Sequence, residues 1–232
     1  MTWSNWAKTV HATPSAVVRP HHPDEAAELI ARATRDGHRV RPLGSGHSFT
    51  GVGAPDGALA LDLSHWTGIV RADQDSGLVT VRAGTPLAQL SAELDALGLA
   101  MANLGDIDRQ TIAGALSTGT HGTGAELGGL ATQVEALELV LADGTRRWCS
   151  RTENTELFNS ARVGLGALGV ISTVTLRCVP SFTLAAEEAP DRLDPVLERF
   201  DDLARDNDHV EFYWFPHGDR TLVKRNNRLP EG

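Results

Sequence analysis

Two short segments that combine glycine, hydroxyl side chains and a histidine constrain the fold of this chain most strongly. The first is residues 41–48, Arg-Pro-Leu-Gly-Ser-Gly-His-Ser, and the second is residues 117–124, Ser-Thr-Gly-Thr-His-Gly-Thr-Gly. Glycines let a loop bend tightly and approach a ligand, and successive backbone N–H groups in such a loop form a site for an anion. His47 adds a nucleophilic imidazole to the first loop. The two segments predict a protein that holds a large phosphorylated cofactor, with His47 as the candidate for a covalent bond to it.

Composition argues against several other classes of site. The net charge is −9, and no block of basic residues of the kind found in nucleic-acid-binding proteins occurs, so we expect no nucleic-acid partner. Cys149 and Cys178 are too few and too far apart for a zinc site or a disulfide framework. The nine histidines are scattered without the spacing of metal ligands, so we expect no metal site.

The sequence also lacks the signals of secretion and membrane insertion. Residues 1–8 carry neither a basic region nor an apolar core typical of a signal peptide. No run approaches the ~18 apolar residues of a transmembrane segment. We therefore expect a cytoplasmic protein without a transmembrane segment, and peripheral association with a membrane stays open.

The first part of the chain is predicted to form a small α/β unit. Residues 15–19 and 58–63 are short apolar runs typical of strands, and another strand starts at Val40 and leads into the first glycine loop. A helix is predicted to begin at Pro23 and to stop at Gly37, with acidic residues in its first turn.

A second unit is predicted from about residue 69. Residues 78–83 and 170–177 have the pattern of strands, and Asp143-Gly144 between residues 134–142 and 145–149 predicts a hairpin. Helical patterns occupy residues 87–97, 111–116 and 156–162.

The pattern changes again from residue 181. An amphipathic helix is predicted over residues 193–204, with strands at 209–215 and 221–224. We expect the run Phe-Tyr-Trp-Phe at 212–215 to be buried, and we expect these elements to begin a second domain that is cut short.

Several motifs have competing interpretations. Residues 164–169 match G-x-G-x-x-G, with Glu187 at a suitable distance, but a helical pattern precedes them and a strand pattern follows, which is the reverse of a dinucleotide-binding site. A loop that approaches another backbone or a cofactor is the better interpretation. Taken alone, His47 could be an exposed histidine on a tight turn, and His121 a hydrogen-bonded structural histidine. Trp3 and Trp6 are expected to pack the N-terminus into a core.

The first loop lacks the Gly-Lys-Ser/Thr of a P-loop, and no G-x-S-x-G motif of an α/β-hydrolase occurs. Residues 41–49, together with Gly105 and residues 111–124, instead resemble the FAD-linked oxidases of the vanillyl-alcohol oxidase superfamily. Within it, the chain resembles the sugar-1,4-lactone oxidoreductases and the related alditol oxidases. The resemblance implies an α+β fold, namely a two-subdomain FAD-binding domain of the vanillyl-alcohol oxidase type followed by the start of a cap (substrate) domain. The implied bounds are 11–180 for the FAD-binding domain, with subdomains 11–66 and 67–180, and 181–232 for the start of a truncated cap domain.

The resemblance also implies the cofactor and its contacts. FAD would be bonded covalently to His47, with hydroxyl groups and backbone amides around its pyrophosphate. The residues expected to contact FAD are Arg41, Pro42, Leu43, Gly44, Ser45, Gly46, His47, Ser48, Gly105, Thr111, Gly114, Ser117, Gly119, Thr120, His121, Gly122, Thr123, Gly166 and Val170.

The implied reaction is hydride transfer from a sugar-1,4-lactone or a related polyol to the flavin, which oxygen or another acceptor then reoxidises. The family's substrate-binding residues are expected beyond residue 232, so no catalytic residue is assigned. Two alternatives stay open. One is a different enzyme on the same fold, such as a UDP-sugar enolpyruvyl reductase, and the other is an FAD-binding module without turnover.

Overall fold

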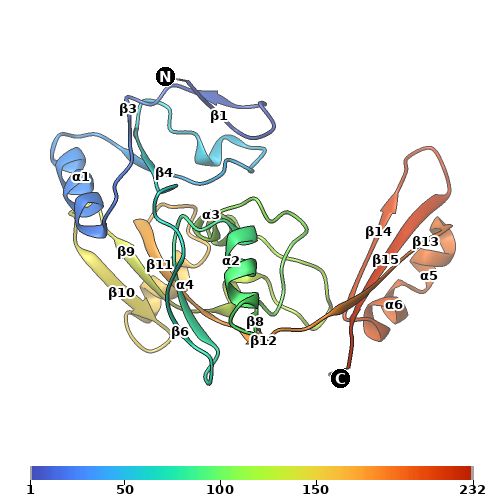
Figure 1. Cartoon of the computed structure of the whole chain (residues 1–232). Coiled ribbons are helices and arrows are strands. Elements are labelled where there is room, and N and C mark those ends of the chain that lie inside the picture. Colours follow the sequence, from blue (N-terminus) through green and yellow to red (C-terminus); the bar gives the residue numbers. More distant parts are fainter. Residues whose placement is uncertain (1, 231–232) are drawn as a thin grey trace.

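The computed structural model describes residues 2–230, and its first sheet is small and parallel (Figure 1). The strands β3 (Ala16–Val18) and β4 (Val40–Leu43) both pair with β5 (Leu59–Asp62), which lies between them. The helix α1 (Pro23–Arg35) connects β3 to β4. The bounds of α1 are those that the sequence predicts. The helix begins at Pro23 with acidic residues in its first turn, and Gly37 lies just past its end.

A short hairpin of β1 (Trp3–Ser4) and β2 (His11–Ala12) precedes this sheet and was not expected from the sequence. It lies above the sheet, beside the turn that carries the 3₁₀ helix η1 (Gly51–Gly53) (Figure 1). The hairpin comes close to the first glycine loop, since a Cβ atom added at Gly46 would lie 3.4 Å from the Trp3 side chain.

The second sheet is antiparallel, with the strand order β10-β9-β11-β7-β6. The predicted hairpin is confirmed, because β9 and β10 pair across the Asp143-Gly144 turn. Asp143 accepts a hydrogen bond from the Thr145 backbone at 2.8 Å, and Gly144 has the positive φ that this turn requires. The strands are β6 (Ile69–Asp73), β7 (Leu78–Arg82), β9 (Val134–Val140), β10 (Arg146–Ser150) and β11 (Val170–Arg177).

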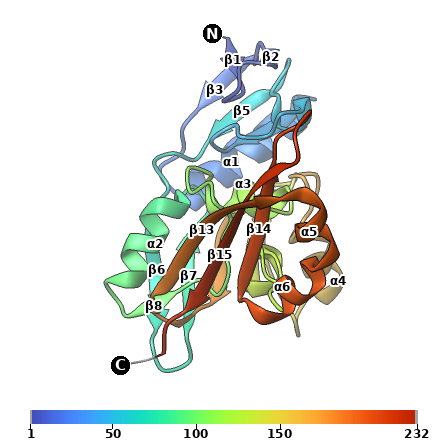
Figure 2. The same cartoon turned by 90° about the vertical axis from the view of Figure 1, so that its right-hand side faces the viewer.

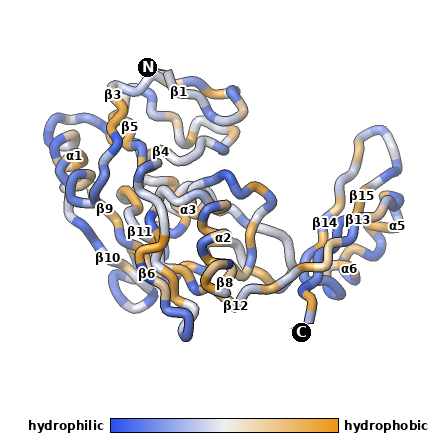
Figure 3. The backbone as a smooth tube through the Cα atoms, in the orientation of Figure 1, coloured by the Kyte–Doolittle hydropathy of each residue, from blue (hydrophilic) through white to orange (hydrophobic). Residues whose placement is uncertain are grey.

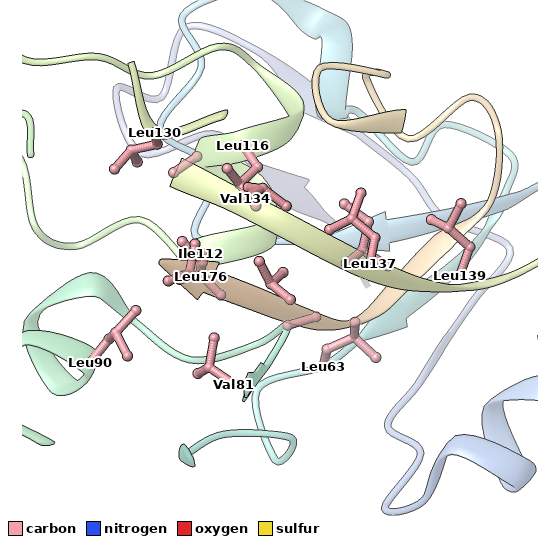
Figure 4. Packing of buried hydrophobic residues seen from close by; sticks show 14 of the residues in the cluster. Leu63, Val81, Leu90, Ile112, Leu116, Leu130, Val134, Leu137, Leu139 and Leu176 are labelled. Carbon is pink, nitrogen blue, oxygen red and sulfur yellow. The ribbon is translucent and has the colours of Figure 1, made fainter. Parts of the chain in front are cut away.

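Helices pack on the second sheet and enclose the main core (Figure 4). Leu90, Ile112 and Leu137 are fully buried there. In Figure 3 the hydrophobic colouring gathers along the second sheet and the helices on it, whereas the turn after β14 (His209–Trp214) is hydrophilic. The elements around this core are α2 (Leu87–Asp95), α3 (Ile112–Ser117), η2 (Leu130–Gln133), α4 (Thr155–Ala161) and the short pair β8 (Leu99–Ala100) and β12 (Val179–Pro180).

The last part of the described chain is a separate antiparallel sheet with the order β13-β15-β14 (Figure 2). Two helices lie beside it, and Val196, Val210 and Val223 form its small core. Its elements are β13 (Leu184–Arg192), α5 (Leu193–Glu198), α6 (Phe200–Asp206), β14 (His209–Trp214) and β15 (Arg220–Arg228).

Two expectations for this part are wrong, and one strand was missed. The predicted helix over 193–204 is two helices that meet at Arg199, where the backbone leaves the helical region. The strand β13 was missed because seven of its nine residues are exposed and show no apolar alternation. The aromatic run at 212–215 is not buried, since the exposed fractions of Tyr213, Trp214 and Phe215 are 45%, 48% and 60%.

Candidate functional site

The first glycine loop leaves the end of β4 and packs against the first turn of α3. A Cβ atom added at Gly44 would lie 2.9 Å from Thr111 Oγ1 and 3.7 Å from Gly114 Cα. Thr111 caps α3, because its hydroxyl oxygen accepts a hydrogen bond from the Gly114 backbone N–H at 3.2 Å. The glycine at position 44 is therefore required by contact with the segment that leads into the second glycine motif.

A pocket opens where these segments meet, and it contains more than half of the residues predicted from the sequence. Those that line it are Arg41, Pro42, Leu43, Gly44, Ser45, Gly46, His47, Ser48, Gly114, Ser117 and Gly166. Thr111 lines the adjoining recess together with Gly44 and Gly114. Residues of the pocket that the sequence reasoning missed are Trp3, Thr50, Val52, Gly53, Gln110, Thr118 and Leu165. Most of these residues are small or apolar, and such residue types do not indicate a binding site in a sequence.

Both glycine segments present backbone N–H groups without an intramolecular acceptor. Within residues 2–230, the N–H groups of residues 45–48 and of residues 121–123 donate no hydrogen bond to a protein atom. Ser45 and His121 are exposed and the other five residues are half-buried, so these N–H groups are free to donate to an anion or to water. The close approach at Gly44 and the amides of residues 45–48, which line the same pocket, fit the pyrophosphate of a dinucleotide.

His47 stands in this loop with its ring against an aromatic side chain. The centroids of the Trp6 and His47 rings are 5.3 Å apart, and the ring planes differ by 19°. The expectation that Trp6 packs into a core is wrong, because the residue is 63% exposed and lies on the loop instead. Trp3 is half-buried and lines the pocket.

The third segment of the site is the loop 164–169. The Arg41 guanidinium donates to the Leu165 carbonyl at 3.5 Å, and a Cβ atom at Gly166 would lie 3.6 Å from the Pro42 ring. Leu165 and Gly166 both have left-handed backbone conformations. The loop follows α4 and precedes β11, so the rejection of a dinucleotide fingerprint is confirmed. Val170 lies on a neighbouring cavity of about 410 Å³, which Arg41, Pro42 and Gly166 also line.

Four predicted residues lie on a different cavity. Gly105, His121, Gly122 and Thr123 line a space of about 600 Å³ between the second sheet's loops and the last sheet. Asn103 holds this segment, since its amide donates to the carbonyls of Thr123 and Gly128, each at 3.1 Å. Its own Oδ1 atom is buried without a hydrogen-bond partner among the described residues.

The remaining two predicted residues connect the cavities. Gly119 turns the chain with φ +70°, and the Thr120 hydroxyl accepts a hydrogen bond from the Gln110 amide at 3.0 Å. Gln110 lines the first pocket. The segment 111–123 thus runs from the first pocket to the cavity beside the last sheet.

A cluster of charges joins the loop after Gly105 to the last sheet. Lys224 Nζ lies 3.4 Å from Asp106 Oδ1 and 3.2 Å from Glu211 Oε1. Burial lowers the pKa of Lys224, but the hydrogen bond to Glu211 and the charge of Asp106 outweigh it, so the pKa is raised above its usual value. Sequence reasoning could not find this cluster, because its members are lone charged residues far apart along the chain.

Two family models match parts of this chain. Residues 14–150 match the model of a family described as the FAD binding domain, and residues 174–232 match the model described as D-arabinono-1,4-lactone oxidase. The chain belongs to the FAD-binding family. The resemblance drawn from the glycine motifs is confirmed by these matches.

Curated relatives include lactone oxidoreductases from bacteria, animals and fungi. The chain is 42% identical to L-gulono-1,4-lactone dehydrogenase of Mycobacterium tuberculosis, over 99% of this chain and 53% of that protein. It is 40% identical to L-gulonolactone oxidase of Bos taurus, over 95% of this chain and 50% of that protein. It is 31% identical to D-arabinono-1,4-lactone oxidase of Debaryomyces hansenii, over 97% of this chain and 43% of that protein. The chain spans about half the length of these relatives.

The fold is shared with cholesterol oxidase from Brevibacterium sterolicum. The TM-score is 0.84 at 22% sequence identity, over 98% of this chain and 47% of that one. This likeness and the family match confirm the expected fold class of the FAD-binding domain. No helix within residues 2–230 is long and apolar enough to cross a bilayer.

Proposed function

We propose that this chain forms the FAD-binding part of an oxidoreductase that oxidises a sugar-1,4-lactone or a related polyol. The pocket at the first glycine loop carries this proposal, because it combines unpaired backbone amides, the contact between Gly44 and Thr111 and the imidazole of His47. The lactone substrates named for the curated relatives support the substrate class. In this proposal residues 11–180 hold FAD and residues 181–232 begin the substrate domain.

FAD would supply the hydride acceptor, and the chain's own residues bind and orient it. The amides of residues 45–48 and the hydroxyls of Ser45, Ser48 and Ser117 suit phosphate oxygens. Residues 166–170 would contact the adenine side through their backbone. Oxygen or another acceptor would reoxidise the flavin, and the chain would work in the cytoplasm or on a membrane surface.

His47 is the proposed point of covalent attachment. The bond would join an imidazole nitrogen to the methyl carbon at position 8 of the flavin ring. In forming this bond, His47 would lose its N–H proton and the methyl group would lose one proton. The two electrons released would reduce the flavin. Oxygen or another acceptor must then take up those electrons. A covalent bond of this kind prevents loss of the cofactor.

Intact mass after acid denaturation tests the cofactor and its attachment together. We expect a gain of one FAD, retained colour in the denatured chain, and loss of both in His47→Ala. His217→Ala, in the turn between β14 and β15, is the matched control and should keep the flavin. Covalent flavin in His47→Ala would move the attachment elsewhere, with His121 as the next candidate.

Turnover tests the substrate class. Flavin bleaching without oxygen is expected on adding L-gulono-1,4-lactone or D-arabinono-1,4-lactone. A flavin-loaded chain that no lactone or polyol reduces would favour the alternative of an FAD-binding module without turnover.

A further inference from the structure

The N-terminal hairpin is fixed to the first glycine loop by backbone and side-chain hydrogen bonds. The Trp6 N–H donates to the Gly46 carbonyl at 2.8 Å. Asn5 is 2% exposed, and its amide donates to the Ser48 carbonyl at 3.0 Å. The side-chain Oδ1 of Asn5 accepts hydrogen bonds from the backbone N–H groups of Thr9 and Val10, which closes the hairpin turn. Bonds to residues on both sides of His47 therefore set the position of Trp6 relative to it.

The Trp6 indole is held against His47 although most of its surface is exposed. Its ring stacks on the imidazole, with an angle of 19° between the planes, and Phe49 meets the indole edge-on at 6.5 Å between centroids. An exposed tryptophan on a freely moving loop would not keep such geometry, because stacking contributes only about 0.5–1.5 kcal/mol. The hydrogen bonds at Asn5 and Trp6 explain why the indole stays in place.

The stacking geometry leaves the reactive edge of the imidazole free. The lone pair of an imidazole nitrogen lies in the plane of the ring, whereas the indole covers one face. Within residues 2–230 no protein group hydrogen-bonds to a ring nitrogen of His47, so the stack is what orients the ring. His47 itself lines the pocket.

We propose that Trp6 is a positioning residue that orients the His47 imidazole for covalent attachment of the flavin, an inference that rests on the function proposed above. Forming a bond requires the nitrogen lone pair to point at the methyl carbon, and a ring that rotates freely about its side-chain bonds spends little time in that direction. Trp6 restricts this rotation before FAD enters.

The test compares variants that keep or remove a flat ring at position 6. Protein produced without flavin is mixed with FAD, and covalent incorporation is followed with time by intact mass and by the fluorescence of the denatured chain. Trp6→Phe keeps an aromatic plane, and Trp6→Leu keeps apolar bulk without one. Trp148→Leu, on the exposed side of β10, is the control for loss of a tryptophan. Non-covalent affinity for FAD is measured in the His47→Ala background.

We expect Trp6→Leu to incorporate flavin about tenfold more slowly and Trp6→Phe to stay within about threefold of the unchanged protein, in line with the energy of one aromatic pair. The non-covalent affinity should be equal in the two variants. Equal incorporation rates in Trp6→Phe and Trp6→Leu would overturn the positioning role while leaving His47 as the attachment site. Covalent flavin in His47→Ala, or no uptake of FAD by the unchanged chain, would overturn the proposed function and this inference with it.

Discussion

Gly44 and Thr111, 67 positions apart in the sequence, approach so closely that a methyl group at Gly44 would lie 2.9 Å from the Thr111 hydroxyl oxygen. That oxygen caps α3, so the contact couples the first glycine loop to the helix that leads into the second. Any change that moves Thr111 alters both segments of the site.

Gly44→Ala is expected to lower stability and weaken FAD binding. The added methyl group must displace the Thr111 side chain, which costs about 1–3 kcal/mol for overpacking and removes part of a helix cap worth about 1 kcal/mol. Thermal unfolding and titration with FAD measure the two effects. Gly218→Ala is the control, since its Cβ atom would meet no atom closer than 3.7 Å. Equal melting temperatures for the two variants would show that the loop and α3 are not coupled in this way.

Lys224→Met is expected to destabilise the contact between the loop after Gly105 and the last sheet by about 1 kcal/mol, the scale of an ion pair near the surface. The folded-state pKa of Lys224 is raised, so its contribution is fully present below the ordinary lysine pKa and is lost as pH rises through the folded value. Urea unfolding at pH 8 should separate the variant from the unchanged protein, and the difference should shrink above about pH 10.5.

Lys8→Met serves as the control, because the Lys8 amine makes no ion pair in the described part of the chain. Salt should also reduce the effect of Lys224→Met. A difference that is independent of pH and salt would mean that Lys224 acts through packing of its aliphatic stem.

Cys178 is expected to resist alkylation in the folded protein. Burial raises the pKa of its thiol to about 11, and the thiolate is the reactive species, so only about one thiol in a thousand is ionised at pH 8. Iodoacetamide should leave a Cys149→Ala variant unmodified at pH 8 and should label it fully in urea, as measured by intact mass. Rapid labelling of the folded variant would show that the segment around β12 opens.

Local signals allowed most elements of the first 180 residues to be predicted. Pro23 and Gly37 bound α1, and Asp143-Gly144 forms the turn between β9 and β10. These features work because a proline or a glycine acts through the backbone of its own neighbours. The elements that were missed depend on contacts between distant residues. β13 exists because it pairs along its length with β15, although its own sequence has no strand pattern.

The site shows the same limit. The glycine loops could be found from residue types alone, and the pocket does contain His47. The placement of Gly105 and residues 121–123 on a separate cavity could not be found, because it depends on how α3 and Asn103 direct the second segment. The position of Trp6 on His47 depends on Asn5, whose hydrogen bonds to the loop have no sequence signature.

The cores of the structure predict how the chain unfolds. One cluster includes Leu61 of β5 and Ile30 of α1 as well as Leu137 and Val174 of the second sheet, so the first two sheets share a core. The last sheet has its own small cluster around Val196, Val210 and Val223. We therefore expect residues before about 180 to open as one cooperative unit and the last sheet to open separately, at a lower free energy.

Leu137→Ala and Val223→Ala distinguish these units by hydrogen exchange. Both positions are buried, Leu137 fully, and removing a fully buried leucine side chain costs about 2–5 kcal/mol. Leu137→Ala should speed exchange in β4 and β5 as well as in β9 and β11, because the core is shared. Val223→Ala should speed exchange in β13, β14 and β15 alone. Val70→Ala, at a residue that is 52% exposed, is the control and should change neither set. If Val223→Ala also lowered protection in β9 and β11, the two cores would be coupled, and the contacts of Asp106 and Thr123 with the last sheet would be the first place to look for the connection.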